Sequence, residues 1–250
     1  MTTAWSRRNF LGEVGLRRER VPSFAAYPFS IPSIGALDRL TLDQPVTFLV
    51  GENGSGKSTL LEAIAIAWGL NPEGGSKNFT FSTRASHSVL SECLYLVRGP
   101  HRAGDSFFLR AESYFNVATE IDRLGVIESY GGKSLHEQSH GEAFFALFMH
   151  RMRGDGFYVF DEPEAALSPS RQLSFLSRLH ELVADGSQFL IATHSPILMA
   201  YPHAAIYLLE NGPPRRVPYR ETEHYTVTKS FLTRTEQMLD VLLDRTPEPS

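Results

Sequence analysis

The sequence predicts an α/β fold in which a mainly parallel sheet is flanked by helices. Strand-like runs alternate along the chain with segments in which apolar residues recur at helical spacing. Two runs, 46–50 and 157–160, are apolar or β-branched throughout, as in strands that are buried on both faces of a parallel sheet. The first is followed by glycine-rich sequence and the second by acids, so we expect ligands at the carboxyl ends of the strands.

The elements are predicted in order from patterning. They are extended pieces at 24–34, a strand at 46–50, a helix at 58–70, strands at 88–97 and 106–111, a helical segment at 118–124, a helix at 142–152, a strand at 157–160, a helix at 171–185, strands at 188–192 and 205–209, and an amphipathic helix at 228–243. With 250 residues, 42% apolar content and no low-complexity linker, we predict a single domain. Its core would cover about 24–210, its C-terminal helix about 226–244, and the tail 245–250 would be flexible.

Charge and cysteine content restrict the classes of protein. The formal net charge of -4 argues against a surface that is basic all over, although it leaves local patches open. One such patch lies near the N-terminus, where it is either a solvated surface or a contact for nucleic acid or a partner: Arg7, Arg8, Arg17, Arg18 and Arg20. Cys93 is the only cysteine, which rules out an intramolecular disulfide and favours a reducing, cytoplasmic location.

Two segments suggest other locations. Residues 6–11 look like a twin-arginine export signal, but the charged stretch at 13–20 stands where such a signal needs an apolar run. Residues 186–209 contain no Asp, Glu, Lys or Arg and have the length of a membrane span. Polar and proline residues in the middle of that stretch favour two buried strands joined by a turn.

A phosphate-binding loop is predicted directly after the strand at 46–50. The string GENGSGKST fits the pattern GxxxxGK[ST], in which glycines let backbone N–H groups wrap a polyphosphate. Lys57 would neutralise the phosphates and Ser58 would reach a Mg²⁺ ion. The alternative is a glycine-rich turn with an incidental lysine. The expected nucleotide-binding residues are Gly51, Asn53, Gly54, Ser55, Gly56, Lys57, Ser58 and Thr59.

The strand at 157–160 delivers two adjacent acids to the same edge of the sheet. Asp161 would hold the Mg²⁺ ion through its water shell, together with Ser58. Glu162 would polarise a water molecule for attack on the terminal phosphate. The alternative is that these acids only cap the following helix.

Two further motifs extend the predicted site. His194 follows the strand at 188–192 at the same edge, so we predict that it senses the phosphate; the alternative is a packed, structural histidine. The turn 138–142 contains Ser139, Gly141 and Glu142 at the start of a helix, where free N–H groups attract anions. An ordinary helix cap by Ser139 explains that turn equally well.

The order of these motifs resembles that of the ABC-type ATPases, in particular small stand-alone ATPases related to RecF and SMC heads. In that resemblance 51–59 is Walker A, 157–162 is Walker B with Glu162 as its catalytic glutamate, and His194 is the switch histidine. Ser139, Gly141 and Glu142 resemble the signature motif, and 165–168 the D-loop. The resemblance implies a P-loop fold with an N-terminal antiparallel part and a helical part that carries the signature. It also implies a head-to-tail homodimer with ATP and Mg²⁺ at its interface.

The chain departs from the family pattern in several places. His140 and Gln138 replace a glycine and a leucine of the signature, and Ser168 stands where transporter subunits carry aspartate. No glutamine lies between Thr59 and Leu135, so the Q-loop cannot be placed, and Glu112 is only its nearest positional candidate. Two alternatives stay open for each of three more residues. Arg84 is either a nucleotide contact, as the resemblance implies, or a surface arginine. Tyr27 and Phe29 either stack on adenine or are aromatic residues of the core.

These features favour an ATPase that converts ATP and water to ADP and phosphate and acts as a switch or clamp. The stretch between Lys57 and Asp161 is too short for SMC-type coiled-coil arms, so closure of the head itself would transmit the signal. A role in DNA repair or antiviral defence, with nucleic acid or a protein as partner, fits the RecF-like resemblance. The alternative is the ATP-binding subunit of a membrane transporter, although we do not expect a membrane domain as a partner.

Overall fold

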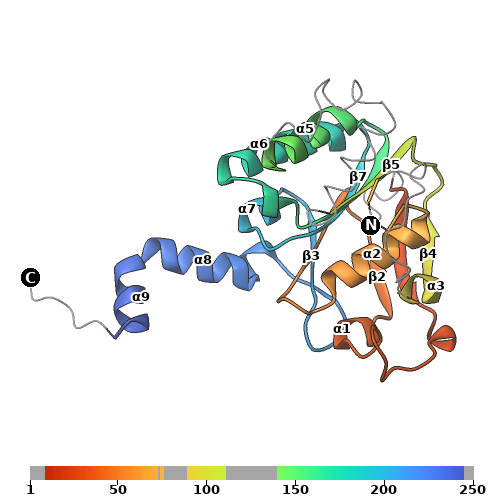
Figure 1. The fold of residues 1–250 in the computed structure, drawn as a ribbon, viewed down its shortest axis with the longest axis horizontal. Helices are drawn as coiled ribbons and strands as arrows, with labels where there is room; N and C mark the ends of the chain where they lie inside the picture. The colour runs from red at the N-terminus through yellow and green to blue at the C-terminus, as the bar shows by residue number, and fades with distance from the viewer. Residues whose placement is uncertain (1–8, 73, 76–88, 111–139, 245–250) are drawn as a thin grey trace, which may run out of the picture.

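The computed structural model describes residues 9–72, 74–75, 89–110 and 140–244, and its centre is a six-stranded sheet (Figure 1). Five neighbouring strands are parallel, and the short last strand is antiparallel to its neighbour. In spatial order they are β5 (Asp105–Arg110), β6 (Gly156–Asp161), β7 (Gln188–Ala192), β3 (Val46–Val50), β8 (Ala205–Leu208) and β9 (Arg215–Arg216). The predicted mainly parallel α/β fold is thus confirmed.

The central strands are buried on both faces because successive side chains point to opposite sides. In β6, Tyr158 and Phe160 belong to one core cluster, whereas Phe157 and Val159 belong to the other. The continuous apolar runs in the sequence arise from this double burial.

Helices α5 (His140–Arg151), α6 (Pro169–Ala184) and α7 (Pro196–Met199) cover the first face. Aromatic side chains fill the space beneath them, and the rings of Phe148 and Phe175 stack with centroids 4.1 Å apart. The Phe160 ring of β6 makes edge contacts with both rings, so β6 packs directly against α5 and α6.

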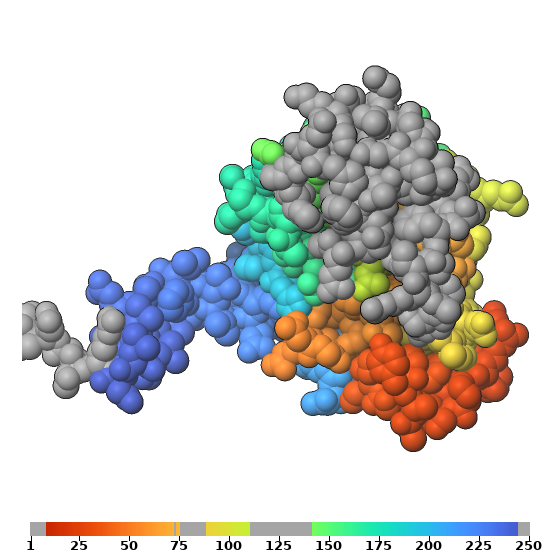
Figure 2. All heavy atoms as spheres, in the orientation of Figure 1, coloured from red at the N-terminus to blue at the C-terminus, as the bar shows by residue number. Residues whose placement is uncertain are grey.

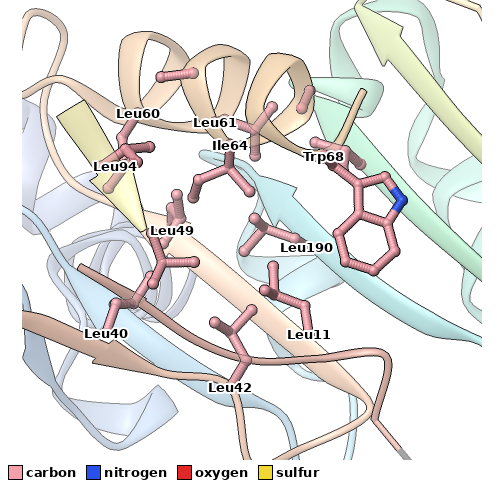
Figure 3. Close-up of a cluster of buried hydrophobic side chains, with 14 of the residues drawn as sticks. Leu11, Leu40, Leu42, Leu49, Leu60, Leu61, Ile64, Trp68, Leu94 and Leu190 are labelled. Carbon is pink, nitrogen blue, oxygen red and sulfur yellow. The ribbon is translucent and has the colours of Figure 1, made fainter. Parts of the chain in front are cut away.

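The second face packs against α2 (Lys57–Trp68), α3 (Leu90–Cys93) and a small antiparallel sheet. That sheet has the order β2 (Arg39–Thr41), β1 (Leu11–Leu16) and β4 (Leu94–Arg98). In Figure 3 the leucines and Ile64 of α2 point at leucines from both sheets, and the Trp68 ring closes the cluster. The expected N-terminal antiparallel part is confirmed, although β1 and β2 themselves were not predicted.

One buried glutamine joins the two sheets. The Gln188 side chain in β7 is almost fully buried, and its Oε1 accepts hydrogen bonds from the backbone N–H groups of Phe10 and Leu11, both at 2.9 Å. Its Nε2 donates to the Leu11 carbonyl at 2.8 Å. The side chain therefore satisfies buried backbone groups at the start of β1.

The structure corrects three of the predicted elements. Residues 24–34 form turns and the short helix α1 (Pro32–Gly35) instead of extended pieces, since Pro32 is well placed at a helix start. The strand-like run 88–97 divides into α3 and β4. The predicted final helix is divided into two helices, α8 (Glu223–Thr233) and α9 (Thr235–Leu242), because the backbone of Arg234 between them is not helical. The predicted helical segment 118–124 and the tail 245–250 lie outside the described residues.

The segment 186–209 forms β7, α7 and β8, so its apolar strands lie inside the sheet, with a short helix between them where a turn was expected. In the described part of the chain no helix combines the length and apolar character needed to cross a membrane. Helices α8 and α9 bury no residue and stand away from the body as an arm (Figures 1 and 2).

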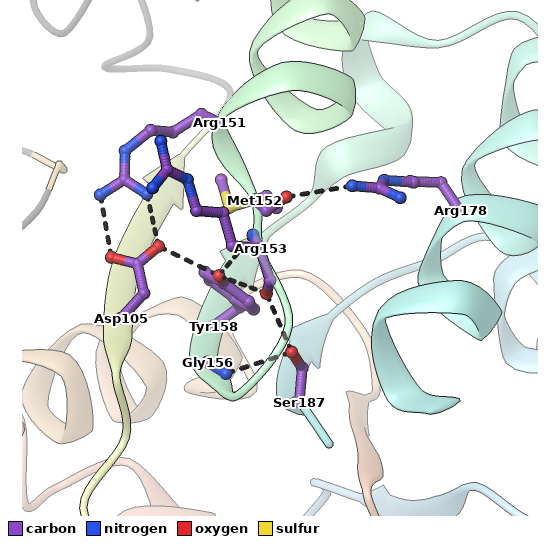
Figure 4. Close-up of polar contacts among 8 residues, drawn as sticks. All are labelled: Asp105, Arg151, Met152, Arg153, Gly156, Tyr158, Arg178 and Ser187. Atoms are coloured by element: carbon purple, nitrogen blue, oxygen red, sulfur yellow. Dashed lines mark hydrogen bonds and ion pairs between the residues drawn. The ribbon is translucent and has the colours of Figure 1, made fainter. Parts of the chain in front are cut away.

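A polar cluster closes the amino ends of β5 and β6 (Figure 4). Arg151 donates to Asp105 through its two terminal guanidinium nitrogens, with one contact at 2.9 Å, and the Tyr158 hydroxyl donates to Asp105 at 3.0 Å. Burial alone would raise the pKa of Asp105, but the hydrogen bond and charge of Arg151 outweigh it and lower that pKa. The cluster lies at the opposite end of the strands from the acids at 161–162.

We expect Gln188→Ala to lower the free energy of unfolding by about 2–4 kcal/mol, because two buried N–H groups lose their acceptor. Urea unfolding followed by circular dichroism measures this. The matched control is Gln237→Ala on the exposed surface of α9, which should change stability by less than about 0.5 kcal/mol. Equal effects of both substitutions would contradict the role of Gln188.

The Asp105 cluster predicts a dependence of stability on pH. A carboxyl whose folded pKa is lowered stabilises the fold fully above its unfolded pKa, near 3.9, and loses that contribution as the pH falls through the folded pKa. We therefore expect Asp105→Asn to cost about 1–3 kcal/mol at pH 7. In parallel urea titrations the gap between wild type and variant should narrow below about pH 4, and a gap that stays constant would contradict this assignment.

Candidate nucleotide site

Three neighbouring strands end at one edge of the sheet and bring the predicted motifs together. In the parallel register Leu49 of β3 pairs with Ala192 of β7, and Ala192 pairs with Asp161 of β6. The loop after β3, the acids at the end of β6 and the residues after β7 therefore start from the same level.

The loop 51–56 has the backbone that a phosphate cradle needs. Gly51, Gly54 and Gly56 all have positive φ angles, of 144°, 82° and 96°. A Cβ atom at Gly51 would lie 2.3 Å from the Leu209 carbonyl oxygen, so there is no room for a side chain. Helix α2 begins at Lys57 without a side-chain cap, which leaves its first N–H groups available to an anion.

Lys57 is almost fully buried beneath this loop. Its Nζ donates to the carbonyl oxygens of Gly51 and Glu52, at 2.8 and 2.9 Å. Burial lowers the pKa of Lys57, while the charge of Glu162 opposes that shift. The ammonium group is thus held at the inner side of the loop, where phosphate oxygens could replace the two carbonyls.

Ser58 and Asp161 meet across the gap between α2 and β6, where Ser58 Oγ donates to Asp161 Oδ1 at 2.9 Å. A hydroxyl and a carboxylate are the hard oxygen ligands that Mg²⁺ prefers, so this pair fits the ion. Arg110, at the end of β5, lies 3.4 Å from Asp161 Oδ2 and 2.6 Å from Glu62 Oε2. Arg110 was not predicted as part of the site, although its position at the end of a strand is a signal that could have indicated it.

Glu162 has the left-handed φ angle of 50°, which is uncommon for a residue other than glycine and costs about 1–3 kcal/mol. Its backbone N–H donates to the Ala192 carbonyl at 2.9 Å, so β7 fixes the turn. The side chain remains 39% exposed, and its Oε1 lies 3.6 Å from His194 Nε2. The carboxylate is therefore directed to the open edge of the site.

His194 makes one contact through its backbone and one through Nδ1 of its ring. Its N–H donates to Glu164 Oε1 at 2.5 Å, and its Nδ1 lies 3.1 Å from Nε2 of His224 in α8. Burial, and then the charge of Lys57, lower the pKa of His194, so the ring is neutral near pH 7. Its Nε2 is buried and has no hydrogen-bond partner among the described residues.

The remaining predicted residues lie in several places. Gly141 and Glu142 are in the first turn of α5, and the exposed Glu142 is 3.4 Å from Arg171 in α6. Phe29 is buried in the core, whereas Tyr27 is 72% exposed and its hydroxyl lies 3.4 Å from Thr59 Oγ1. Of the two aromatic residues, Tyr27 is therefore the one whose ring is available to stack on an adenine base. Ser139, Arg84 and Glu112 lie outside the described residues.

Two adjoining hollows border the loop. The first, about 860 Å³, lies between 51–55, the turn 208–215 and the start of α8. The second, about 760 Å³, is lined by Glu52, Asn53, Glu162 and His194, and by four residues of α8: Glu223, His224, Val227 and Thr228. Such volumes suit a nucleotide. Nothing in the sequence pointed to α8 as a wall of the site, because His224 is a single histidine in a polar helix.

Two family models match the sequence. One is described as "AAA domain" and matches residues 30–97, which include the phosphate loop. The other is described as "AAA domain, putative AbiEii toxin, Type IV TA system" and matches residues 134–200, which include Asp161, Glu162 and His194.

Relatives and solved structures were also found. The cobalt import ATP-binding protein CbiO of Salmonella paratyphi A is 26% identical over 205 residues, which are 70% of this chain and 72% of that protein. The arabinose import ATP-binding protein AraG 2 of Burkholderia thailandensis is 30% identical over 202 residues, 66% of this chain and 35% of that protein. The SMC head domain from Thermotoga maritima superimposes with a TM-score of 0.45 and 19% identity, covering 84% of this chain and 98% of that one.

The parallel sheet, the glycine-rich loop before α2 and the acids at the end of β6 define a P-loop nucleoside triphosphatase. The family models and the sequence relatives narrow this class to ATPases. The fold and motifs of the chain are those of a P-loop ATPase of the ABC type, and its relatives support the hydrolysis of ATP as its activity.

We expect Gly51→Ala to weaken ATP binding about tenfold or more, because the new methyl group would force the loop away from the Leu209 carbonyl. Titration with a fluorescent ATP analogue measures the affinity. Gly12→Ala in β1 is the control, since its Cβ would find its nearest neighbour at an ordinary 3.7 Å. Unchanged affinity in Gly51→Ala would contradict the close-packed loop.

Proposed function

We propose that Lys57, Ser58, Asp161, Glu162 and His194 act together on ATP bound at this edge of the sheet. Lys57 would neutralise the β- and γ-phosphates, and the loop from Gly51 to Thr59 would wrap them. Glu162 would be the general base that takes a proton from the attacking water, and His194 would contact the γ-phosphate. The observation that carries this proposal is the buried His194 Nε2, which has no partner in the described part of the chain and lies 3.6 Å from Glu162.

We propose Mg²⁺ as the metal, with Ser58 and Asp161 as the residues that would hold it. Their oxygens are 2.9 Å apart, and both are of the ligand type that Mg²⁺ selects. The ion would neutralise charge on the phosphate oxygens during transfer. Arg110, 3.4 Å from Asp161, would limit the space on the other side of that carboxylate.

We further propose that two copies of the chain enclose two ATP molecules. Each phosphate loop would face the signature residues Ser139, Gly141 and Glu142 of the other copy. The open edge supports this arrangement, because the side chains of Glu162 and His194 remain 39% and 31% exposed and a second surface could cover them. ATP binding would close the dimer, and hydrolysis would reopen it.

The biological role would depend on which partner the closing of the dimer acts on. We propose a cytoplasmic switch or clamp acting on nucleic acid or on a partner protein, in DNA repair or antiviral defence. The second family model, whose description mentions a toxin–antitoxin system, supports a defence role. The alternative is an ATP-binding subunit of a membrane transporter, and the relatives named as import ATP-binding proteins support it.

We expect Glu162→Gln to lower the rate of ATP hydrolysis by about 10²–10⁴-fold, since the amide cannot accept the proton of water. The variant should still bind ATP and shift toward a dimer in analytical ultracentrifugation. Lys57→Ala, in contrast, should lose nucleotide binding. Equal hydrolysis by wild type and Glu162→Gln would overturn the assigned base, and an ATP-bound monomer would overturn the dimer.

The two roles can be separated with the same trapped variant. Glu162→Gln is purified from cells in the presence of ATP, with Lys57→Ala as the control that cannot be trapped. Nucleic acid or a non-membrane protein recovered only with Glu162→Gln supports the switch or clamp. A polytopic membrane protein recovered in that way would support the transporter alternative.

A further inference from the structure

A second histidine, His224, lies directly behind the switch histidine. Its Nε2 is 3.1 Å from His194 Nδ1, and the two ring centroids are 5.2 Å apart. Both side chains are partly buried, and both line the hollow that also contains Glu162. His224 comes from α8, the first helix of the arm, so a distant part of the sequence reaches the site.

The base of α8 is fixed firmly enough to hold this contact. Thr222 is fully buried, and its side-chain oxygen caps the helix by accepting from the Tyr225 N–H at 3.3 Å. Tyr219, just before the cap, donates its hydroxyl to the Pro196 carbonyl at 2.8 Å. Pro196 begins α7, two residues after His194, so α8 is attached to the same segment that carries the switch histidine.

The chemistry of the three side chains selects one arrangement of protons. A carboxylate accepts but does not donate, so Glu162 favours a proton on the facing His194 Nε2. In a neutral imidazole the other nitrogen, Nδ1, is then an acceptor. The contact at 3.1 Å therefore requires His224 to donate its Nε2–H to His194 Nδ1.

Both rings are expected to be neutral near pH 7, as this arrangement needs. Burial is the main reason why the pKa of each histidine is lowered, and the charge of Lys57 adds to it. Two protonated rings would bring N–H against N–H at this contact, which the geometry does not allow.

We propose that His224 is a positioning residue for ATP hydrolysis: its Nε2–H holds His194 in the tautomer whose own Nε2–H points at Glu162 and the γ-phosphate. The inference rests on the proposed role of His194 and adds a residue that sequence motifs do not indicate. Because the Nε2 of His224 contacts His194, its loss should affect the hydrolysis step more than ATP binding.

Kinetics of three variants test the positioning role. His224→Leu removes the donor and should lower kcat about tenfold or more, the size of effect typical of groups that orient a functional histidine. His224→Gln keeps an N–H donor and should retain most of kcat, and in His224→Leu the change in KM for ATP should be smaller than the change in kcat. His101→Leu, at an exposed histidine outside the site, is the matched control.

A double-mutant cycle shows whether His224 works through His194. In a His194→Ala background, His224→Leu should have no further effect on kcat, because the ring that it positions is gone. Additive losses, or equal losses in His224→Leu and His224→Gln, would overturn the proposal. Thermal unfolding and ATP affinity of each variant identify a loss of kcat that comes from misfolding of α8.

Nitrogen chemical shifts of ¹⁵N-histidine-labelled protein give a readout that does not depend on activity. His194 should show a protonated Nε2 and a bare Nδ1 in the wild type and in His224→Gln, and a mixture of tautomers in His224→Leu. Unchanged shifts in His224→Leu would overturn the positioning role. If the shifts behave as expected but His194→Ala hydrolyses ATP normally, the proposed function of His194 fails instead.

Discussion

The parallel hydrogen-bond ladder among β3, β7 and β6 is the constraint on which the site depends. Leu49, Ala192 and Asp161 are neighbours in one register, so the loop, the acids and His194 all leave the sheet at the same edge. A shift of one residue in either pairing would exchange the two faces of a strand. Phe160 would then leave the aromatic cluster under α5 and α6, and the core therefore enforces the register of the site.

Much of this architecture could be predicted because strands buried on both faces leave a simple pattern. The strands Val46–Val50 and Gln188–Ala192 were predicted to the residue, and the chemistry at their ends followed from the rule that ligands bind there. The small sheet was not predicted. Leu11–Leu16 contains two glycines and adjoins a charged stretch, and its pairing with residues 94–98 is a long-range contact without a local signal. Arg234 likewise divides the last helix without a proline or glycine to mark the break.

In the site, too, the residues that follow a recognisable strand could be predicted, and those that depend on tertiary packing could not. Lys57, Ser58, Asp161, Glu162 and His194 lie together because each follows a strand that could be recognised, whereas their assigned roles stay predictions. Residues that depend on tertiary packing were out of reach. Gln188 resembles any strand glutamine until β1 is placed beside it, and His224 lies on a helix whose own sequence gives no reason to place it near a phosphate.

At the positions where phosphate and metal would bind, the polar side chains of the described residues already form hydrogen bonds within the protein. These hydrogen bonds affect how the site can respond to ATP. Lys57 bonds to two loop carbonyls, and Ser58 bonds to Asp161. Binding of magnesium and ATP would therefore exchange these hydrogen bonds for new ones, so its gain is the difference between the two sets. Only contacts that differ between the two states can shift the conformation of the protein. His194 Nε2 is unlike these groups, because it has no hydrogen bond among the described residues to give up and lies 3.6 Å from Glu162. If His194 contacts the γ-phosphate as proposed, that phosphate would add a contact that ADP cannot make, and the histidine pair would then be the part of the site that distinguishes ATP from ADP.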